Sequence, residues 1–284
     1  MFLHLGFDIR FRLVSPTPMV LVLHTHPSRE DTLCLPDRLD IQPGLPIREY
    51  FDGFGNRCSR IVAPPGDLRI SGETVVSDSG LHKPTIEGLR LHPVEELPSE
   101  ILQFLLPSRY CEVDLLTEIA WSLFGHTPVG WQRVESVCDW VHNSIEFGYH
   151  DARKTRTALE TYKEGEGVCR DFQHLVIAFC RTLNIPARHA TGYLGDIGVP
   201  PSADPMDFSA WFAVYLEGRW RTLDARNNTP RIGRVLMARG RDAADVAMTT
   251  SFGVAELTGF QVWTEELADF SPATLLPKLS SGAL

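Results

Sequence analysis

The sequence predicts an α+β protein in which a small antiparallel β-sandwich precedes a set of helices and a second antiparallel sheet. Residues 1–90 alternate apolar and polar side chains with the period of a half-buried strand, and frequent prolines exclude long helices there. After about residue 110, apolar side chains recur at three- and four-residue steps before strand-like segments return. We therefore expect a β-sandwich domain over residues 1–95 and a core domain over residues 96–284.

The N-terminal strands are marked by alternation and turn chemistry. Every second residue from Leu3 to Leu13 is apolar, and Met19–Leu23 is a second strand-sized apolar run. The stretch Asp52-Gly-Phe-Gly-Asn56 supplies turn residues between two further strands at 47–51 and 57–62, so a hairpin is expected there.

The second half of the chain has helical spacing first and strand spacing later. Apolar stripes predict helices over residues 112–124, 130–145 and 168–183. Strands are expected over residues 188–193, 209–216 and 220–224, the last two joined by a tight turn at Glu217-Gly218-Arg219.

Composition limits the partners. The net charge of −9 argues against nucleic acid and anionic membrane. The six cysteines are dispersed without a C-x-x-C pair, so neither zinc nor a disulfide framework is indicated, and no cofactor is expected. Asp8, Arg10 and Arg12 interrupt the apolar pattern of the N-terminus, which resembles neither a signal peptide nor a membrane span. A cytoplasmic protein with reduced thiols is expected.

Cys169 is the candidate nucleophile. It follows Gly165-Glu-Gly167 and stands at the predicted start of a helix. Free amides and the positive end of the helix dipole favour a thiolate there, and the same amides can stabilise an oxyanion on a substrate. The other reading, a small buried hydrophobe, fits Cys138 and Cys180, which lie beside apolar stripes.

Several segments together resemble the transglutaminase-like superfamily. They are Gly167-Val-Cys169-Arg-Asp-Phe-Gln-His174, Asn184-Ile-Pro-Ala-Arg188, Gly192-Tyr193, Phe208-Ser-Ala-Trp211 and Trp220-Arg-Thr-Leu-Asp224. The residues before about 90, with their Asp52–Asn56 hairpin, resemble the β domain that precedes this core in bacterial transglutaminase-like proteins. The resemblance implies a papain-like transglutaminase core with a cysteine–histidine–aspartate site. It assigns Cys169 as the nucleophile and Asp224 as the orienting acid.

The residue at the position of the family's histidine is Ser209, whose hydroxyl does not titrate near neutral pH. All ten histidines lie at or before position 189. His189 and His174 are poorly placed by strand and helix geometry, whereas His150 lies in a loop that leads towards the cysteine helix. An Asp224-bound water beside Ser209 is another substitute base, and Asp224 can instead simply cap a turn or bind Arg226.

The expected function is that of a cysteine protease or amidase, a hydrolase or acyltransferase acting on a peptide or protein substrate through an acyl-enzyme on Cys169. The alternative is a pseudoenzyme that keeps the cleft as a binding or scaffold protein. A third hypothesis is that Ser209 was introduced in place of the histidine in order to trap a substrate. Downstream arginines form either a solvated loop or a wall that binds a substrate carboxylate; they are Arg226, Arg231, Arg234, Arg239 and Arg241. The sequence does not indicate an oligomeric state.

Overall fold

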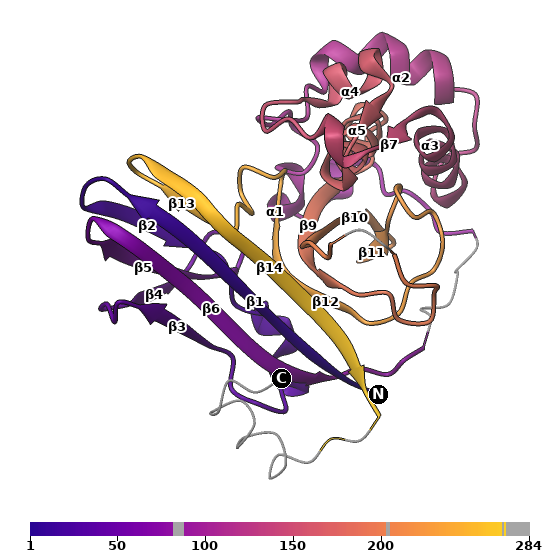
Figure 1. Cartoon of the computed structure of the whole chain (residues 1–284). Coiled ribbons are helices and arrows are strands. Elements are labelled where there is room, and N and C mark those ends of the chain that lie inside the picture. The colour runs from indigo at the N-terminus through magenta and orange to yellow at the C-terminus, as the bar shows by residue number, and fades with distance from the viewer. Residues whose placement is uncertain (82–87, 203–204, 269, 271–284) are drawn as a thin grey trace.

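The computed structural model describes residues 1–81, 88–202, 205–268 and 270, and it has the predicted α+β architecture. Long strands form one end of the molecule, and helices packed on a second antiparallel sheet form the other (Figure 1). Both predictions, the strand-rich N-terminal region and the helix-plus-sheet core, are confirmed.

The sandwich consists of two four-stranded antiparallel sheets. The first has the order β14-β1-β6-β3 and contains β14 (Ala255–Leu267), β1 (Phe2–Leu13), β6 (Gly66–Ser77) and β3 (Arg38–Gln42). The second has the order β13-β2-β5-β4 and contains β13 (Thr249–Ser251), β2 (Thr17–Leu21), β5 (Arg57–Ala63) and β4 (Arg48–Phe51). The alternation in β1 buries Leu3, Leu5 and Phe7 between the sheets.

The C-terminal strands belong to the sandwich, although the sequence placed everything after residue 95 in the core. Strand β14 pairs with β1 along its whole length, and β13 pairs with β2. Alternation identifies a strand but not its partner, and β1 is covered on both edges only because β14 returns to it. A boundary near residue 95 therefore stays a proposal for where the core begins, but the core does not extend to the end of the chain.

The core has helices around a four-stranded sheet of order β11-β10-β9-β12. Its strands are β9 (Ala187–Leu194), β10 (Ser209–Leu216), β11 (Arg219–Leu223) and β12 (Arg234–Gly240). Its helices are α1 (Ser99–Leu102), α2 (Thr117–Phe124), α3 (Trp131–Ser144), α4 (Ala158–Glu164) and α5 (Cys169–Thr182). Helix α5 is central: every residue from Asp171 to Thr182 is buried, because other helices and the sheet pack around it. The turn between β10 and β11 places Glu217 and Gly218 at positive φ, as a two-residue hairpin requires.

The loop Asp52–Asn56 closes the expected hairpin and joins the sandwich to the core. The Asp52 carboxylate accepts hydrogen bonds from the backbone amides of Phe54 and Asn56 at 2.8 and 2.9 Å. The Asn56 side chain in turn exchanges two hydrogen bonds with the backbone of Arg239 on β12, at 2.8 and 2.9 Å. The Asn56 side chain thus pairs with the edge strand of the core sheet as one residue of a neighbouring strand would.

Candidate active site

Cys169 is the first residue of α5 and is half-buried. The helix start is fixed by Asp171, whose carboxylate accepts the backbone amide of Val168 at 3.1 Å. Gly167 permits this approach, because a Cβ there would lie 2.8 Å from the Asp171 Cβ. The first intrahelical hydrogen bond runs from the Asp171 amide to the Val168 carbonyl at 2.8 Å, so the amides of Cys169 and Arg170 precede the helical ladder beside the thiol.

The surroundings of the thiol stabilise its neutral form. Burial and the Asp207 carboxylate raise the pKa of the Cys169 thiol to about 11, and Asp224 acts in the same direction. The backbone N–H of Ala210 donates to the sulfur and, with Arg226, only partly offsets this rise. The expectation of a lowered thiol pKa is therefore wrong for this arrangement, because desolvation and two carboxylates outweigh the helix terminus.

Ser209 opens β10 next to the cysteine. It pairs with Gly192 of β9, and its neighbour Ala210 supplies the amide that reaches the Cys169 sulfur. A Cβ on Gly192 would lie 2.1 Å from the carbonyl oxygen of Val235, so the strands approach too closely there for any side chain. The backbone at Ser209 and Ala210 thus lies beside the nucleophile, and the side chain at position 209 is a hydroxyl where the resemblance expects an imidazole.

Asp224 follows β11 directly and is buried, with its carboxylate occupied by several donors. Gln173, one turn after Cys169 on α5, donates to it at 3.1 Å. The Asn227 side-chain amide donates at 2.7 Å, and the backbone amides of Arg226 and Asn227 donate at 3.1 and 3.2 Å. The Arg234 guanidinium lies 3.5 Å away. Asp224 is therefore a saturated turn cap in this structure, which argues against a water-activating role.

Two of the three candidate histidines lie on another side of α5. His174 is buried, stacks on Tyr110 at 5.0 Å and accepts the Ala243 amide at 3.1 Å. The His189 ring lies 5.1 Å from that of His174. Burial lowers the pKa of both rings, that of His189 to about 4. Their predicted poor placement is confirmed, since their contacts belong to this internal cluster.

His150 lies in η4 (Tyr149–Asp151), on a loop that starts beside the cysteine. The short strands β7 (Glu146–Phe147) and β8 (Glu166–Gly167) pair in parallel, so the chain enters this loop next to the residues that precede Cys169. The loop is tied back to the helix where the Arg170 side chain donates to the Arg153 carbonyl at 2.7 Å. His150 as a substitute base therefore remains a proposal.

The sequence reasoning missed Asp207 and Gln173 at this site, and it named Arg226 only as a partner of Asp224 or of a substrate carboxylate. Asp207, two positions before Ser209, is exposed in surface area, yet desolvation raises its pKa and its charge acts on Cys169. Arg226 lies over the Phe147 ring at 4.0 Å and also influences the thiol. Gln173 could have been found from its spacing, because a residue four positions after the helix start shares the face of Cys169.

The downstream arginines do not form one wall. The Arg239 side chain donates to the Phe54 carbonyl, and Arg241 pairs with Asp245. Arg234 belongs to the Asp224 network. The reading as separate ion pairs and loop contacts is favoured for these three.

Comparison with known proteins identifies the family of the chain. A family model described as the transglutaminase-like superfamily matches residues 121–225, which include Cys169, Ser209 and Asp224. A solved structure titled a "Putative Cysteine Protease" from Cytophaga hutchinsonii is 33% identical, covering 96% of this chain and 93% of that chain, with a TM-score of 0.81. The chain belongs to the transglutaminase-like superfamily. A curated relative, "Uncharacterized protein ML0607" of Mycobacterium leprae, is 22% identical over 222 residues, 74% of this chain and 77% of that protein.

Two features of the described residues bear on the location and chemistry of the protein. None of their helices is both long and apolar enough to cross a membrane. Within the same residues, no group of three or more histidine, cysteine, aspartate or glutamate side chains is arranged to hold a metal ion. The cytoplasmic location and the lack of a cofactor stay predictions for this transglutaminase-like protein.

Proposed function

We propose that this transglutaminase-like protein is a cysteine hydrolase or acyltransferase of the protease or amidase type, with Cys169 as nucleophile. The observation that carries the proposal is the half-buried thiol at the start of α5, beside the Ala210 N–H and at the positive end of the helix. The relation to a protein described as a cysteine protease supports a peptide or protein as substrate.

The reaction begins when the sulfur attacks a peptide or carboxamide carbonyl carbon. A C–S bond forms, the π electrons move to the oxygen, and the first-turn amides of α5 stabilise this oxyanion. Collapse breaks the C–N bond, and the departing amine takes up the thiol proton through water. Water or an amine then attacks the thioester and releases Cys169. The Ser209 hydroxyl can hold the water but cannot serve as a general base. The rates of acylation and deacylation therefore lack the roughly 10²- to 10⁴-fold acceleration that general acid–base catalysis supplies.

Binding without turnover is the second candidate, and two observations favour it. The thiol pKa of about 11 leaves little thiolate near neutral pH. The Asp224 carboxylate is fully engaged by Gln173, Asn227 and backbone amides. A protein with this site keeps the substrate cleft but releases its ligand unchanged.

Intact-protein mass spectrometry with an activated ester and a peptide amide separates the two candidates. The enzyme proposal expects a covalent adduct on Cys169 with the ester, slower adduct formation with the amide, and none in Cys169→Ala. Ser209→His should increase turnover of the amide by about 10²-fold or more. Cys138→Ala is the matched control, because that thiol is fully buried. No adduct with either substrate in the parent protein would reject the enzyme proposal.

His150→Gln tests the substitute base separately. If His150 supplies the missing imidazole, its replacement should slow amide turnover about 10²-fold while ester acylation changes little. His126→Gln is the control, since His126 is an exposed residue between α2 and α3. Equal rates for both variants would exclude His150.

A further inference from the structure

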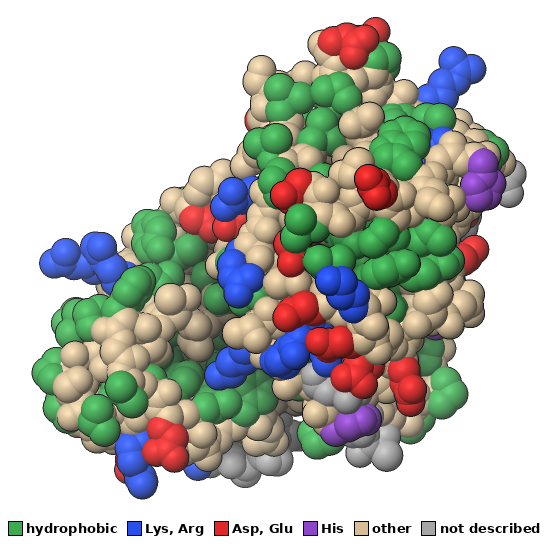
Figure 2. Space-filling model, turned by 90° about the horizontal axis from the view of Figure 1, so that it is seen from above, with side chains coloured by type: hydrophobic (Ala, Val, Ile, Leu, Met, Phe, Trp, Pro, Cys, Tyr) green, Lys and Arg blue, Asp and Glu red, His purple; other side chains and the backbone are tan. Residues whose placement is uncertain are grey.

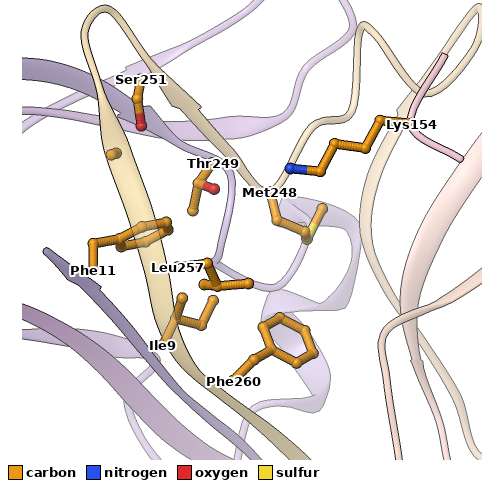
Figure 3. A pocket seen from close by; sticks show the side chains of 9 residues that line it. Ile9, Phe11, Lys154, Met248, Thr249, Ser251, Leu257 and Phe260 are labelled. Atoms are coloured by element: carbon orange, nitrogen blue, oxygen red, sulfur yellow. The ribbon is translucent and has the colours of Figure 1, made fainter. Parts of the chain in front are cut away.

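A cleft with an apolar floor opens where the interior of the sandwich is not fully closed. Ile9 and Phe11 of β1 form its floor, and Leu257 and Phe260 of β14 lie beside them (Figure 3). The register pairs Ile9 with Phe260 and Phe11 with Leu257, so all four side chains belong to the same face of the sheet. Ile9 and Phe11 are only 2% and 6% exposed, whereas Leu257 and Phe260 are 54% and 44% exposed. This part of the inner face lacks a covering layer.

The far wall of the cleft carries a cation. Lys154 reaches across from the loop after η4 towards Met248, with its ammonium nitrogen at the mouth of the apolar floor (Figure 3). Thr249 and Ser251 of β13 add hydroxyl groups to the same rim. An apolar floor with one ammonium group complements a ligand that joins an apolar side chain to a carboxylate.

Each wall of the cleft contacts, or adjoins in sequence, a segment that contains a residue next to Cys169 or Ser209. On one side, the Phe260 ring lies 5.9 Å from that of Phe208, the residue before Ser209. On the other side, Lys154 follows Arg153, whose carbonyl accepts the side chain of Arg170, the residue after Cys169. The cleft is therefore linked to the candidate site through Phe208 on one side and through Arg153 and Arg170 on the other.

The size of the cleft limits its occupant. Its volume is about 250 Å³, less than the roughly 300–1,000 Å³ of sites that enclose a whole small molecule. An apolar cavity of about 150 Å³ already accommodates benzene. The space therefore suits one large apolar side chain. On the face shown in Figure 2, hydrophobic side chains lie at both the sandwich end and the core end, with acidic and basic side chains interspersed between them.

We propose that the cleft binds the C-terminal residue of a peptide substrate, with its apolar side chain over Leu257 and Phe260 and its carboxylate on Lys154. This inference rests on the proposed function, since it assigns the substrate class of the same site. It predicts action on a bond close to the C-terminus of a peptide that ends in leucine or phenylalanine.

Binding is measured with the full chain carrying Cys169→Ala, so that turnover does not enter. The probes are fluorescein-Gly-Gly-Ala-Leu with a free C-terminal carboxylate and the same peptide as its amide, followed by fluorescence anisotropy. The acid should bind about fivefold more tightly than the amide, as expected for a partly exposed ion pair. Lys154→Gln should abolish this preference, whereas Lys163→Gln on α4, which is also an exposed lysine, should retain it.

The apolar part is tested by truncation. Leu257→Ala and Phe260→Ala should weaken binding of both peptides, while Val62→Ala, which shortens an exposed side chain of β5, should not. Equal affinity for acid and amide, or an unchanged preference in Lys154→Gln, would overturn the proposal. So would concentration-dependent dimerisation that Leu257→Ala disperses, because a second copy would then occupy the cleft.

The outcome separates the two proposals. A Lys154-dependent preference without any acyl-enzyme in the wild-type chain would reject turnover but keep the cleft as a peptide-binding site. If an acyl-enzyme forms, and its rate and peptide preference do not change in the Lys154, Leu257 and Phe260 variants, the enzyme proposal stands and the cleft proposal is rejected.

Discussion

The ionisation of Cys169 gives the most direct test of how this site differs from a poised cysteine enzyme. The surroundings raise the pKa of its thiol from 9.0 to about 11, chiefly by burial and by the charge of Asp207. At pH 7 about one molecule in 10⁴ then carries the thiolate, roughly a hundredfold less than an ordinary cysteine. A more basic thiolate is intrinsically about tenfold more nucleophilic, so the net alkylation rate should be about tenfold lower.

The assay follows iodoacetamide labelling of the peptide that contains Cys169 by mass spectrometry between pH 6 and 11. The logarithm of the rate should rise with unit slope up to about pH 10 without a plateau. Asp207→Asn should move the curve to lower pH, because it removes the largest charge that opposes ionisation. Asp245→Asn is the control, since that carboxylate pairs with Arg241 instead. A plateau below pH 8 in the parent protein would refute this account of the thiol.

Three predictions concern stability. Asn56→Ala should lower the free energy of unfolding by about 2 kcal/mol, since it leaves the N–H and C=O of Arg239 unpaired. Asn143→Ala, at an exposed position of α3, should lower it by under about 0.5 kcal/mol. Urea unfolding measures both, and equal losses would contradict the role of the Asp52–Asn56 loop. Arg181→Met should cost about 3 kcal/mol, because the buried guanidinium donates to three carbonyls and a serine hydroxyl; a melting temperature unchanged within error would refute it. Burial lowers the pKa of His189 from 6.5 to about 4, so the unfolded chain binds a proton that the folded chain does not. Stability should therefore fall as the pH drops from 6.5 to about 4, by on the order of 3 kcal/mol from this residue, and His189→Gln should flatten that part of the urea-derived profile.

Much of the fold could be predicted because its signals are local. The alternation of β1 and the stripe of α5 each record one buried face, and the hairpin at Asp52–Asn56 has its own turn chemistry. The position of β14 could not be predicted in this way. Its pairing with β1 joins residues more than 240 positions apart, and alternation contains no information about which edge a strand will cover.

At the site, too, the identity of the residues could be predicted from the sequence, but their environment could not. The family resemblance assigned Cys169, Ser209 and Asp224 to one site, and in the structure Ala210, the residue after Ser209, donates its amide to the Cys169 sulfur. The sequence could not predict the ionisation of the thiol. A helix N-terminus lowers a pKa, but the opposing desolvation and the nearby Asp207 arise only when the strands pack over the helix.

The state of Asp224 decides how the two candidate functions relate. In a cysteine–histidine–aspartate site, the carboxylate orients the imidazole and stabilises its charged form. Here Gln173 and Asn227 occupy both carboxylate oxygens, so the acid is held in place without an imidazole. If Ser209→His lowers the thiol pKa and Asp224→Asn cancels that gain, the carboxylate is available to a ring and the site is an enzyme that lacks one group. If Asp224→Asn lowers stability but does not change the pKa of the Cys169 thiol in the Ser209→His background, Asp224 is a structural cap. Binding without turnover then becomes the function that this arrangement supports.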